Sequence, residues 1–305
     1  MLQYIVWNVQ PQIFNFLPIR WYGLMWAIGI FLALLIVQKI YRYEKLPEKW
    51  IDKQFIYVVV GTVLGARLGH CLFYEWHLAQ EPFTLFGINF KYENYYITHP
   101  WQIFNFFNGG LSGLASHGGA IGIIIAMYLY DKKVTHKGFL WGMDRLVIGA
   151  AVTGACIRFG NLLNSEIYGS VTTMPWGFIF VRDPNGDGLP HHPTQIYEML
   201  YCIVTFVLLW GMYWKKQSYK KTGLLFGVFL IGIFGTRFLL EFIKLDQETF
   251  ESGMLLNMGQ ILSIPLIIWG IWLIIRAKKN LITEEKVDAG KQETLQNNKN
   301  DKKKR

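Results

Sequence analysis

A run of polar residues closes one of the apolar segments of the chain. The stretch "IRFGNLLNSEIYG" (157–169) follows "GFLWGMDRLVIGAAVTGAC" (138–156), which is apolar enough to lie in lipid. Arg158, Asn161 and Asn164 recur every three residues, so on a helix they share one face, and Glu166 follows within a turn. Two interpretations are open: an interfacial helix end that meets water, or a polar site.

The residue types favour a site for an anion. Arginine presents a planar fork that binds phosphate through two hydrogen bonds and does not lose its charge. Arg158, Arg237 and Arg67, taken with His117, indicate an anionic substrate together with a proton acceptor. The sequence has no Gly-x-Ser-x-Gly elbow, no His-Glu-x-x-His pair and no phosphate-binding P-loop, so a serine nucleophile, a metal or a cofactor is not predicted.

The elements that must position these residues are membrane-spanning helices. Of the 305 residues, 52% are hydrophobic and only 17% are charged, which leaves no room for a large soluble domain. Each apolar window is about 18 to 22 residues long, enough to cross the hydrocarbon core. The sequence therefore predicts an all-α integral membrane protein with seven spans, at about 20–40, 54–75, 110–130, 138–158, 194–214, 223–243 and 258–276.

The positive charges predict the orientation of the spans. Lys and Arg gather between the first and second windows, the third and fourth, the fifth and sixth, and after the seventh. The positive-inside bias then places the amino terminus outside and the carboxyl terminus in the cytoplasm. It also accounts for the net charge of +9, so nucleic-acid binding is not predicted. We expect a catalytic domain at 1–276, a small outer head from loops 76–109, 159–193 and 244–257, and a disordered basic tail at 277–305.

Each window carries a polar residue at a similar depth. Counted from the cytoplasmic charges at about 1.5 Å per residue, all of them fall in the outer third of the bilayer. Inserting a charged side chain within a span costs about 3 kcal/mol, so several charges at one depth must either pair with one another or have a function. A structural ion pair explains any one alone, but the shared depth favours a site in the outer leaflet, where the obvious anion is a phospholipid headgroup. The residues are Tyr22, Arg67, His117, Arg158, Glu198, Arg237 and Gln260.

Smaller signals concern packing and turns. Glycines four residues apart, in the series Gly61–Gly65–Gly69 and the pairs Gly118–Gly122 and Gly223–Gly227, predict close helix contacts. Cys71, Cys156 and Cys202 have no metal-ligand spacing and are expected to be buried packing residues. "RDPNGDGLPHHP" (182–193) reads as turns, and the amino terminus has no features of a removable signal peptide.

These residues also carry a family resemblance. The stretch at 158–169 resembles the signature Arg-x-Gly-Asn-x-x-Asn-x-Glu-x-x-Gly of the prolipoprotein diacylglyceryl transferase family, with Arg158, Gly160, Asn161, Asn164, Glu166 and Gly169 in register. Matching pieces over residues 18–276 are "RWYG" (20–23), "GARLG" (65–69), "HGGAIG" (117–122), "HPTQIYE" (192–198), "RFLLEF" (237–242) and "NMGQILSIP" (257–265). Ile157 departs from the glycine usual before the signature arginine, and Leu162 from a common aromatic.

The resemblance implies transfer of the diacylglyceryl group of phosphatidylglycerol to the lipobox cysteine of a prolipoprotein signal peptide, at the outer leaflet of a bacterial inner membrane, by a monomer surrounded by membrane lipids. His117 would accept or relay the thiol proton, and Arg158 and Arg237 would hold the phosphate. Tyr22, Asn161 and Glu166 would orient the headgroup, and Gly169 would permit close backbone approach. Supporting roles would fall to Asn164, Glu241, Arg67, Glu198 and Gln260.

Three rival functions stay open at this point. A transporter usually shows internal repeats and a midplane site, which the sequence lacks. A seven-span receptor has no need of an arginine-rich layer. Another lipid acyl- or phosphotransferase is the strongest rival.

Overall fold

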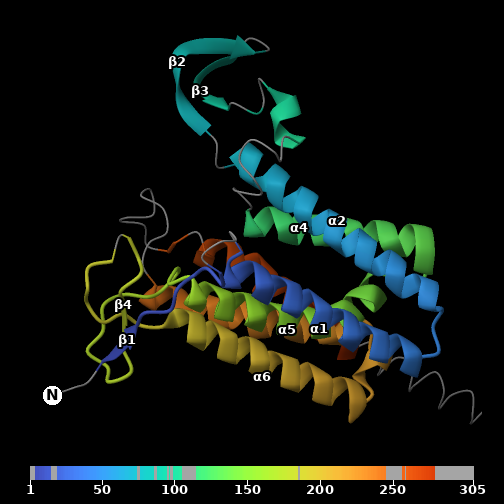
Figure 1. Cartoon of the computed structure of the whole chain (residues 1–305). Coiled ribbons are helices and arrows are strands. Elements are labelled where there is room, and N and C mark those ends of the chain that lie inside the picture. Colours follow the sequence, from blue (N-terminus) through green and yellow to red (C-terminus); the bar gives the residue numbers. More distant parts are fainter. Residues whose placement is uncertain are drawn as a thin grey trace, which may run out of the picture. The chain divides into compact units, whose positions relative to one another are not determined.

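The structure is a computed structural model that describes residues 4–14, 19–73, 76–85, 88–94, 96, 99–104, 115–184, 186–244, 256–257 and 259–278 (Figure 1). The chain divides into two compact units. The first combines Met1–Ile40 with Met143–Arg305, and the second is Tyr41–Gly142. Each unit is described by itself.

The elements follow one another in a mostly helical order. Along the chain they are β1 (Ile5–Trp7), α1 (Trp21–Tyr43), α2 (Glu48–Phe73), β2 (Trp76–Leu85), β3 (Ile88–Asn94), the 3-10 turn η1 (Pro100–Phe104), α4 (Ser116–Tyr130), the π-helical turn η2 (Asp131–Thr135), α5 (Phe139–Leu163), β4 (Phe178–Phe180), α6 (Thr194–Trp214), η3 (Ser218–Lys220), α7 (Leu224–Leu230), the π-helical turn η4 (Ile231–Gly235), α8 (Thr236–Leu240) and η5 (Glu241–Ile243). A further helix, Gly259–Lys278, follows.

Six helices of the described residues are long and apolar enough to cross a membrane. They are Trp21–Tyr43, Glu48–Leu72, Phe139–Leu163, Thr194–Trp214, Leu224–Ile243 and Gly259–Lys278. Each corresponds to a predicted window, so the prediction of a multi-pass helical membrane protein is confirmed at that level. The remaining window, 110–130, is described only from residue 115, where α4 accounts for 15 residues.

The outward faces of these helices are apolar. Val204 and Val207 of α6 and Ile268 and Ile275 of the last helix are large hydrophobic side chains that are mostly exposed. In water such surfaces would drive aggregation, whereas lipid tails cover them at no cost. The exposed apolar surface therefore agrees with the membrane assignment.

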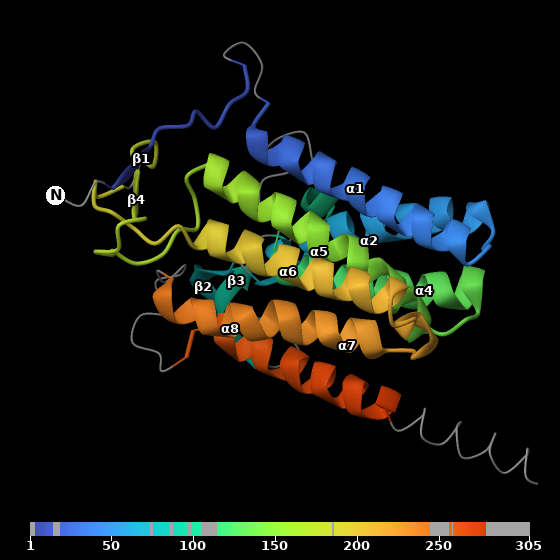
Figure 2. The ribbon, with the colours of Figure 1, turned by 90° about the horizontal axis from the view of Figure 1, so that it is seen from below.

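Close backbone contacts order the helices of the first unit. Thr153 Oγ1 of α5 donates a hydrogen bond of 2.9 Å to the carbonyl of Gly29 in α1. On the other side of α5, a Cβ built on Gly154 would lie 3.2 Å from Cys202 Sγ of α6. Figure 2 shows the resulting row, in which α1, α5, α6, the α7–α8 helix and the last helix run side by side. The polar residues of the first unit that the sequence analysis singled out lie at one end of this row of helices.

The pair Gly223–Gly227 behaves differently from the prediction. Gly227 does contact the last helix, because a Cβ there would lie 2.8 Å from the carbonyl oxygen of Gly270. Gly223 instead precedes α7 with a φ of 91°, a left-handed conformation that glycine adopts without strain. Asp144 of α5 caps the helix from outside, since its Oδ2 and Oδ1 accept from the amides of Gly223 (2.6 Å) and Phe226 (2.8 Å). Predicting a packing role for Gly223 was wrong.

The glycine prediction is confirmed in the second unit. Gly61, Gly65 and Gly69 of α2 face Gly118 and Gly122 of α4. A Cβ on Gly69 would lie 2.7 Å from the Cα of Gly118, so side chains at these positions would force the helices apart. The small residues let the two backbones touch.

The cysteine prediction also agrees with the structure. Cys71 and Cys202 are buried, Cys156 is half-buried, and all three thiols are free. The prediction of buried packing residues is therefore confirmed for Cys71 and Cys202, whereas Cys156 is only half-buried.

Two small sheets lie outside the predicted spans. In the segment predicted as outer loop 76–109, β2 and β3 pair antiparallel. In the segment 159–193, β4 pairs in parallel with β1 from the amino terminus, with Val6 opposite Ile179. The all-α prediction therefore missed a local pair of consecutive strands, β2 and β3, and a sheet that joins distant segments, β1 and β4.

The sheet formed by β1 and β4 packs against the end of α5 and stabilises it. Trp7 packs on the buried cluster of Leu162, Phe178 and Phe180, and its Nε1 donates to the carbonyl of Leu162 at 2.9 Å. The helix ends at Leu163, beyond the predicted end at residue 158. The loop boundary at 159 was therefore wrong, and the first signature residues are helical.

Candidate active site

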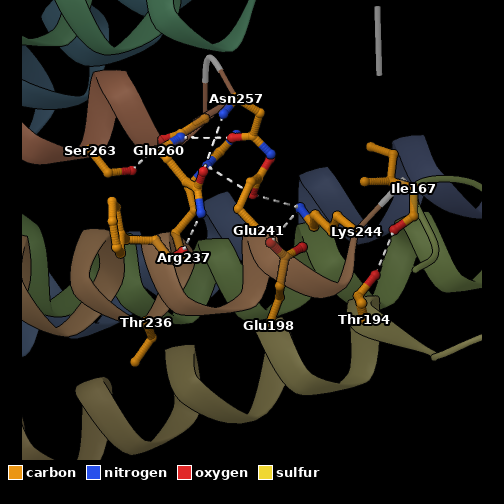
Figure 3. A network of polar contacts seen from close by, with 12 residues as sticks. Ile167, Thr194, Glu198, Thr236, Arg237, Glu241, Lys244, Asn257, Gln260 and Ser263 are labelled. Carbon is orange, nitrogen blue, oxygen red and sulfur yellow. Dashed lines mark hydrogen bonds and ion pairs between the residues drawn. The ribbon is translucent and has the colours of Figure 1, made fainter. Parts of the chain in front are cut away.

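Seven polar side chains of the first unit form one connected network at an end of its helices. Part of it is drawn in Figure 3, where Glu198 of α6 faces Glu241 and Lys244. Its members, in order of contact, are Glu166, Asn161, Arg158, Glu198, Lys244, Glu241 and Arg237.

Glu198 is the centre of this network. Its side chain is 0% exposed and lies between two cations from different elements. Arg158 Nε of α5 is 3.1 Å from Oε2, and Lys244 Nζ, just past η5, is 2.8 Å from Oε1. A buried carboxylate is stable only when it is paired, and here each oxygen has its own cation.

A second carboxylate continues the network along the helix Leu224–Ile243. Glu241 Oε2 lies 3.7 Å from Lys244 Nζ and 3.9 Å from Arg237 Nε. Arg237 and Glu241 are four positions apart on one helical face, and Lys244 follows directly after the helix ends. Lys244 is 2% exposed and Glu241 5%, whereas Arg237 is 18% exposed. The Arg237 guanidinium is therefore the most exposed member of this group and lies beside the buried pair of Glu241 and Lys244.

The signature residues form the other arm. Arg158 Nη1 donates to Asn161 Oδ1 at 3.5 Å, and Asn161 Nδ2 donates to Glu166 Oε1 at 2.8 Å. Asn164 Nδ2 lies 3.4 Å from the same oxygen. One turn of helix and the loop after it thus order the polar groups predicted to share a face.

Glu166 turns back toward the helix because its neighbours adopt unusual backbone conformations. Ser165 and Ile167 have φ values of 57° and 60°, a region that a β-branched residue such as isoleucine rarely occupies. Thr194 Oγ1 donates to the carbonyl of Ile167 (3.0 Å), and Gln195 Nε2 to that of Glu166 (2.7 Å). The start of α6 holds the strained segment in place, as residues at functional sites often require.

Gly169 lies in a space that admits no side chain. A Cβ built there would be 2.6 Å from the carbonyl oxygen of Ile243, 2.7 Å from Thr194 Cγ2 and 2.9 Å from His192 Cβ. Its amide donates to the carbonyl of His192 at 2.8 Å, and it forms a β-bridge with Lys244. The signature loop therefore contacts the end of the helix Leu224–Ile243 directly through its backbone.

Tyr22 and Gln260 border the network. The Tyr22 ring packs against Gly160, where a Cβ would lie 3.1 Å from Tyr22 Cδ2, and its hydroxyl accepts from Trp26 Nε1 at 3.1 Å. Gln260 and Asn257 exchange hydrogen bonds of 2.9 and 3.1 Å that cap the last helix, and Gln260 Nε2 lies 3.4 Å from the carbonyl of Phe238. Figure 3 shows Gln260 among the residues next to Arg237. Its contacts favour a supporting role.

The remaining two predicted residues belong to the second unit. Arg67 Nε donates to the carbonyl of Ile103 at 3.1 Å, and Nη2 to Tyr96 Oη at 3.2 Å. His117 belongs to α4, but its side chain lies outside the described residues. The structure therefore brings the first-unit residues together and leaves the single layer of all seven spans as a prediction.

The arrangement suits an anion. The network holds three cations and, with Glu166 included, three carboxylates, and the two arginines are its most exposed ion-paired cations. Arg158 is 20% exposed and pairs through Nε and Nη1, whereas Arg237 pairs through Nε. Both forks thus retain nitrogen donors that no hydrogen bond or ion pair of the described residues uses, and such donors bind phosphate oxygens well.

Sequence reasoning missed Lys244. The prediction assigned residue 244 to an outer loop, yet its ammonium group is buried between Glu198 and Glu241. The signal was present, because Lys244 stands three residues after Glu241 and seven after Arg237, on one helical face. Thr194 and Gln195, which hold the strained loop, gave no such signal.

The comparisons agree with the geometry. The family model for prolipoprotein diacylglyceryl transferase matches residues 9–276. A protein of Porphyromonas gingivalis named phosphatidylglycerol–prolipoprotein diacylglyceryl transferase is 46% identical over 297 residues, covering 92% of this chain and 98% of its own. Proteins of the same name from Chloroherpeton thalassium and Tolumonas auensis are each 40% identical, covering 92% and 90% of this chain and 97% and 98% of theirs. The chain therefore belongs to the prolipoprotein diacylglyceryl transferase family.

Proposed function

We propose that the chain transfers the diacylglyceryl group of phosphatidylglycerol to the lipobox cysteine of a prolipoprotein signal peptide. The thiol sulfur forms a bond to a glycerol carbon of the lipid, and the bond from that carbon to the phosphate oxygen breaks. The products are a thioether and glycerol phosphate, and the thiol proton passes to a base. Family membership supports the class of reaction, and the relatives carry both substrates in their name.

One observation carries the assignment of the site. Arg158 and Arg237 stand at the partly exposed edge of the network, each within ion-pair distance of a buried carboxylate. A phosphodiester offers anionic oxygens, and guanidinium groups bind such oxygens through charge-assisted hydrogen bonds. We infer that the phosphate lies between the two guanidinium groups and that both follow its charge as the phosphate leaves.

The other polar residues orient the headgroup in this proposal. Asn161 and Glu166 form a hydrogen-bonded pair beside Arg158 and offer groups for the glycerol hydroxyls. Tyr22 packs beside the same helical turn, against Gly160. Gly169 lets the loop backbone approach Lys244 and so closes the site.

The supporting residues act through the arginines. Glu198 lies 3.1 Å from Arg158 Nε and orients that guanidinium, and Glu241, at 3.9 Å, makes a longer ion pair with Arg237 Nε. Asn164 and Gln260 stabilise the loop and the last helix. Arg67 supports the second unit through Ile103 and Tyr96.

Activation of the thiol requires a base or a positive field. A free cysteine thiol is only a few per cent ionised at neutral pH. We assign His117, at the start of α4, the role of accepting or relaying this proton. The substrate supplies its own nucleophile, which is consistent with the absence of a nucleophile motif in the sequence.

The topology proposal extends the six described spans. We propose seven spans within a catalytic domain at 1–276, with the amino terminus outside and a basic cytoplasmic tail at 277–305. The loops 76–109, 159–193 and 244–257 would form the outer head. The protein would act as a monomer in a bacterial inner membrane, with the site open to the outer leaflet.

Reconstitution tests the reaction directly. Purified protein would be incubated in vesicles with phosphatidylglycerol labelled in its glycerol backbone and its acyl chains, together with a lipobox peptide. Both labels should reach the peptide cysteine, and glycerol phosphate should appear in equal amount. Transfer of acyl label alone would instead identify an acyltransferase.

A further inference from the structure

The ring of His191 contacts two hydrogen-bond acceptors at once. Its Nδ1 lies 2.8 Å from the carbonyl oxygen of Gly169, the last residue of the signature. Its Nε2 lies 2.9 Å from Asp187 Oδ1. The side chain is buried between the signature loop and the turn-rich outer loop.

Asp187 is fixed as an ionised acceptor by its own turn. Its Oδ1 also accepts from the amide of Leu189 at 2.9 Å, across Gly188, whose φ is 73°. The hydrogen bond from His191, followed by that from Leu189, lowers the pKa of the Asp187 carboxyl. The carboxylate is therefore present near neutral pH and cannot donate.

A carbonyl oxygen cannot donate either. Both contacts of His191 therefore need an N–H on the ring, and only the protonated imidazolium has two. A neutral ring must turn one lone pair toward an acceptor, which loses that hydrogen bond and sets two electron-rich atoms against each other.

The other groups around the ring are tyrosines, a second histidine and a second carboxylate. Tyr168 lies against His191 with ring centroids 4.7 Å apart, and its hydroxyl donates to Asp183 Oδ2 at 2.5 Å. Burial, then Asp183, raises the pKa of Tyr168, so this ring stays neutral. Next in sequence, His192 bonds Tyr197 Oη at 3.2 Å, and burial followed by the charge of His191 lowers its pKa. The carboxylates that face His191 are thus Asp187 directly and Asp183 through Tyr168.

The Gly169 carbonyl is well placed to control the signature loop. The amides of Gly169 and Ser170 donate to the carbonyls of His192 (2.8 Å) and Ile243 (2.9 Å). Glu166 lies three residues before Gly169, across the strained Ile167. Releasing the carbonyl would loosen the segment that joins Asn161 and Glu166 to the end of the helix Leu224–Ile243.

We propose that His191 positions the signature loop only when its ring is protonated. The imidazolium then donates to both the Gly169 carbonyl and Asp187, a link called the fastening below. This link holds Glu166 in the site. Loss of the ring proton loosens segment 166–170. The consequence for catalysis rests on the proposed function, whereas the fastening itself does not. The turn "DPNGDG" then serves to present Asp187 rather than to bind a ligand.

Hydrogen exchange tests the fastening without any substrate. The amides of Gly169 and Ser170 would be followed in the full chain in nanodiscs at pH 6 and pH 8.5, corrected for intrinsic exchange. Exchange should be at least about tenfold faster at pH 8.5, as expected for the loss of a charge-assisted hydrogen bond. His191→Gln should exchange fast at both pH values. The exposed His136 provides a matched control, because His136→Asn should leave the wild-type response unchanged.

Equal protection at both pH values in the wild-type chain would overturn the proposal, whether or not His191→Gln folds. Transfer of diacylglyceryl label would be measured on the same samples. A pH-dependent loop without any transfer would refute the proposed function and leave the fastening intact. Normal transfer with a pH-independent loop would refute the fastening alone.

Discussion

Lys244 Nζ lies 2.8 Å from Glu198 Oε1, so the end of one membrane span is tied to the start of another by a buried ion pair. The same carboxylate pairs with Arg158, and Lys244 also approaches Glu241. The buried charges of Glu198, Glu241 and Lys244 therefore orient the two arginines, which are the more exposed members of the network.

Removing Lys244 should uncouple these elements. Lys244→Met leaves two buried carboxylates with one cation each, and breaking a buried pair costs about 3–5 kcal/mol. We expect a lower unfolding temperature in detergent and a loss of transfer. Combining it with Glu198→Gln should cost less than the sum of the single changes, by about 0.5–3 kcal/mol. Strict additivity in a double-mutant cycle of thermal stability would contradict the pairing.

The fork of Arg158 should matter more than its charge. Arg158→Lys keeps the cation but cannot serve Glu198 and a phosphate from one planar group. Loss of one charge-assisted hydrogen bond of about 1.5–3 kcal/mol predicts about a 10- to 100-fold lower rate of thioether formation. Arg182→Lys is the matched control, because Arg182 is exposed and bonds Asn8 away from the network. Near-wild-type turnover of Arg158→Lys would remove Arg158 from the phosphate role.

Gly169 should tolerate no side chain. In Gly169→Ala the methyl group would meet the Ile243 carbonyl at 2.6 Å, and overpacking of this kind costs about 1–3 kcal/mol. Transfer should fall sharply while the protein remains folded. Gly211→Ala in α6 serves as control, because a Cβ there has no neighbour within 4 Å among the described residues. If both variants are equally active in the vesicle assay, the close contact has no role in the site.

His117 should be replaceable at high pH. His117→Gln removes the proton acceptor, so transfer should slow most at neutral pH and recover in part as the pH approaches that of thiol ionisation, about 8.5. Rates of the variant and the wild-type chain would be compared from pH 6.5 to 9. A constant ratio across this range would favour a structural histidine.

Asp144 is a buried acid for which we predict no chemistry. It caps the helix that begins at Leu224, and loss of a cap costs about 0.5–2 kcal/mol. Asp144→Asn should therefore lower the unfolding temperature by a few degrees and leave turnover at low temperature intact. The exposed Asp52→Asn should change neither quantity. Inactivity of folded Asp144→Asn would show that the cap does more than stabilise.

Sequence periodicity predicted the helical part of the architecture well. Apolar windows identify spans because lipid imposes their length, and six of the seven windows match helices of the described residues. The three- and four-residue spacings of Arg158–Asn161 and Arg237–Glu241 likewise appear as contacts, because helix geometry fixes them locally.

Non-local contacts were beyond this reasoning. The pairing of β1 with β4 joins segments about 170 residues apart, and the sequence of neither segment indicates its partner. The return of Glu166 to Asn161 depends on left-handed conformations at Ser165 and Ile167, which neither residue type favours. Those conformations come from Thr194 and Gln195 of α6, so tertiary contacts decide them.

The central claim is that one lipid phosphate lies between Arg158 and Arg237. A structure of the chain in nanodiscs with bound phosphatidylglycerol measures this directly. Phosphate oxygens should lie within hydrogen-bond distance of both guanidinium groups, with Glu198 and Glu241 still on their far sides. A headgroup seated away from either arginine, with transfer activity retained in the same sample, would contradict the account.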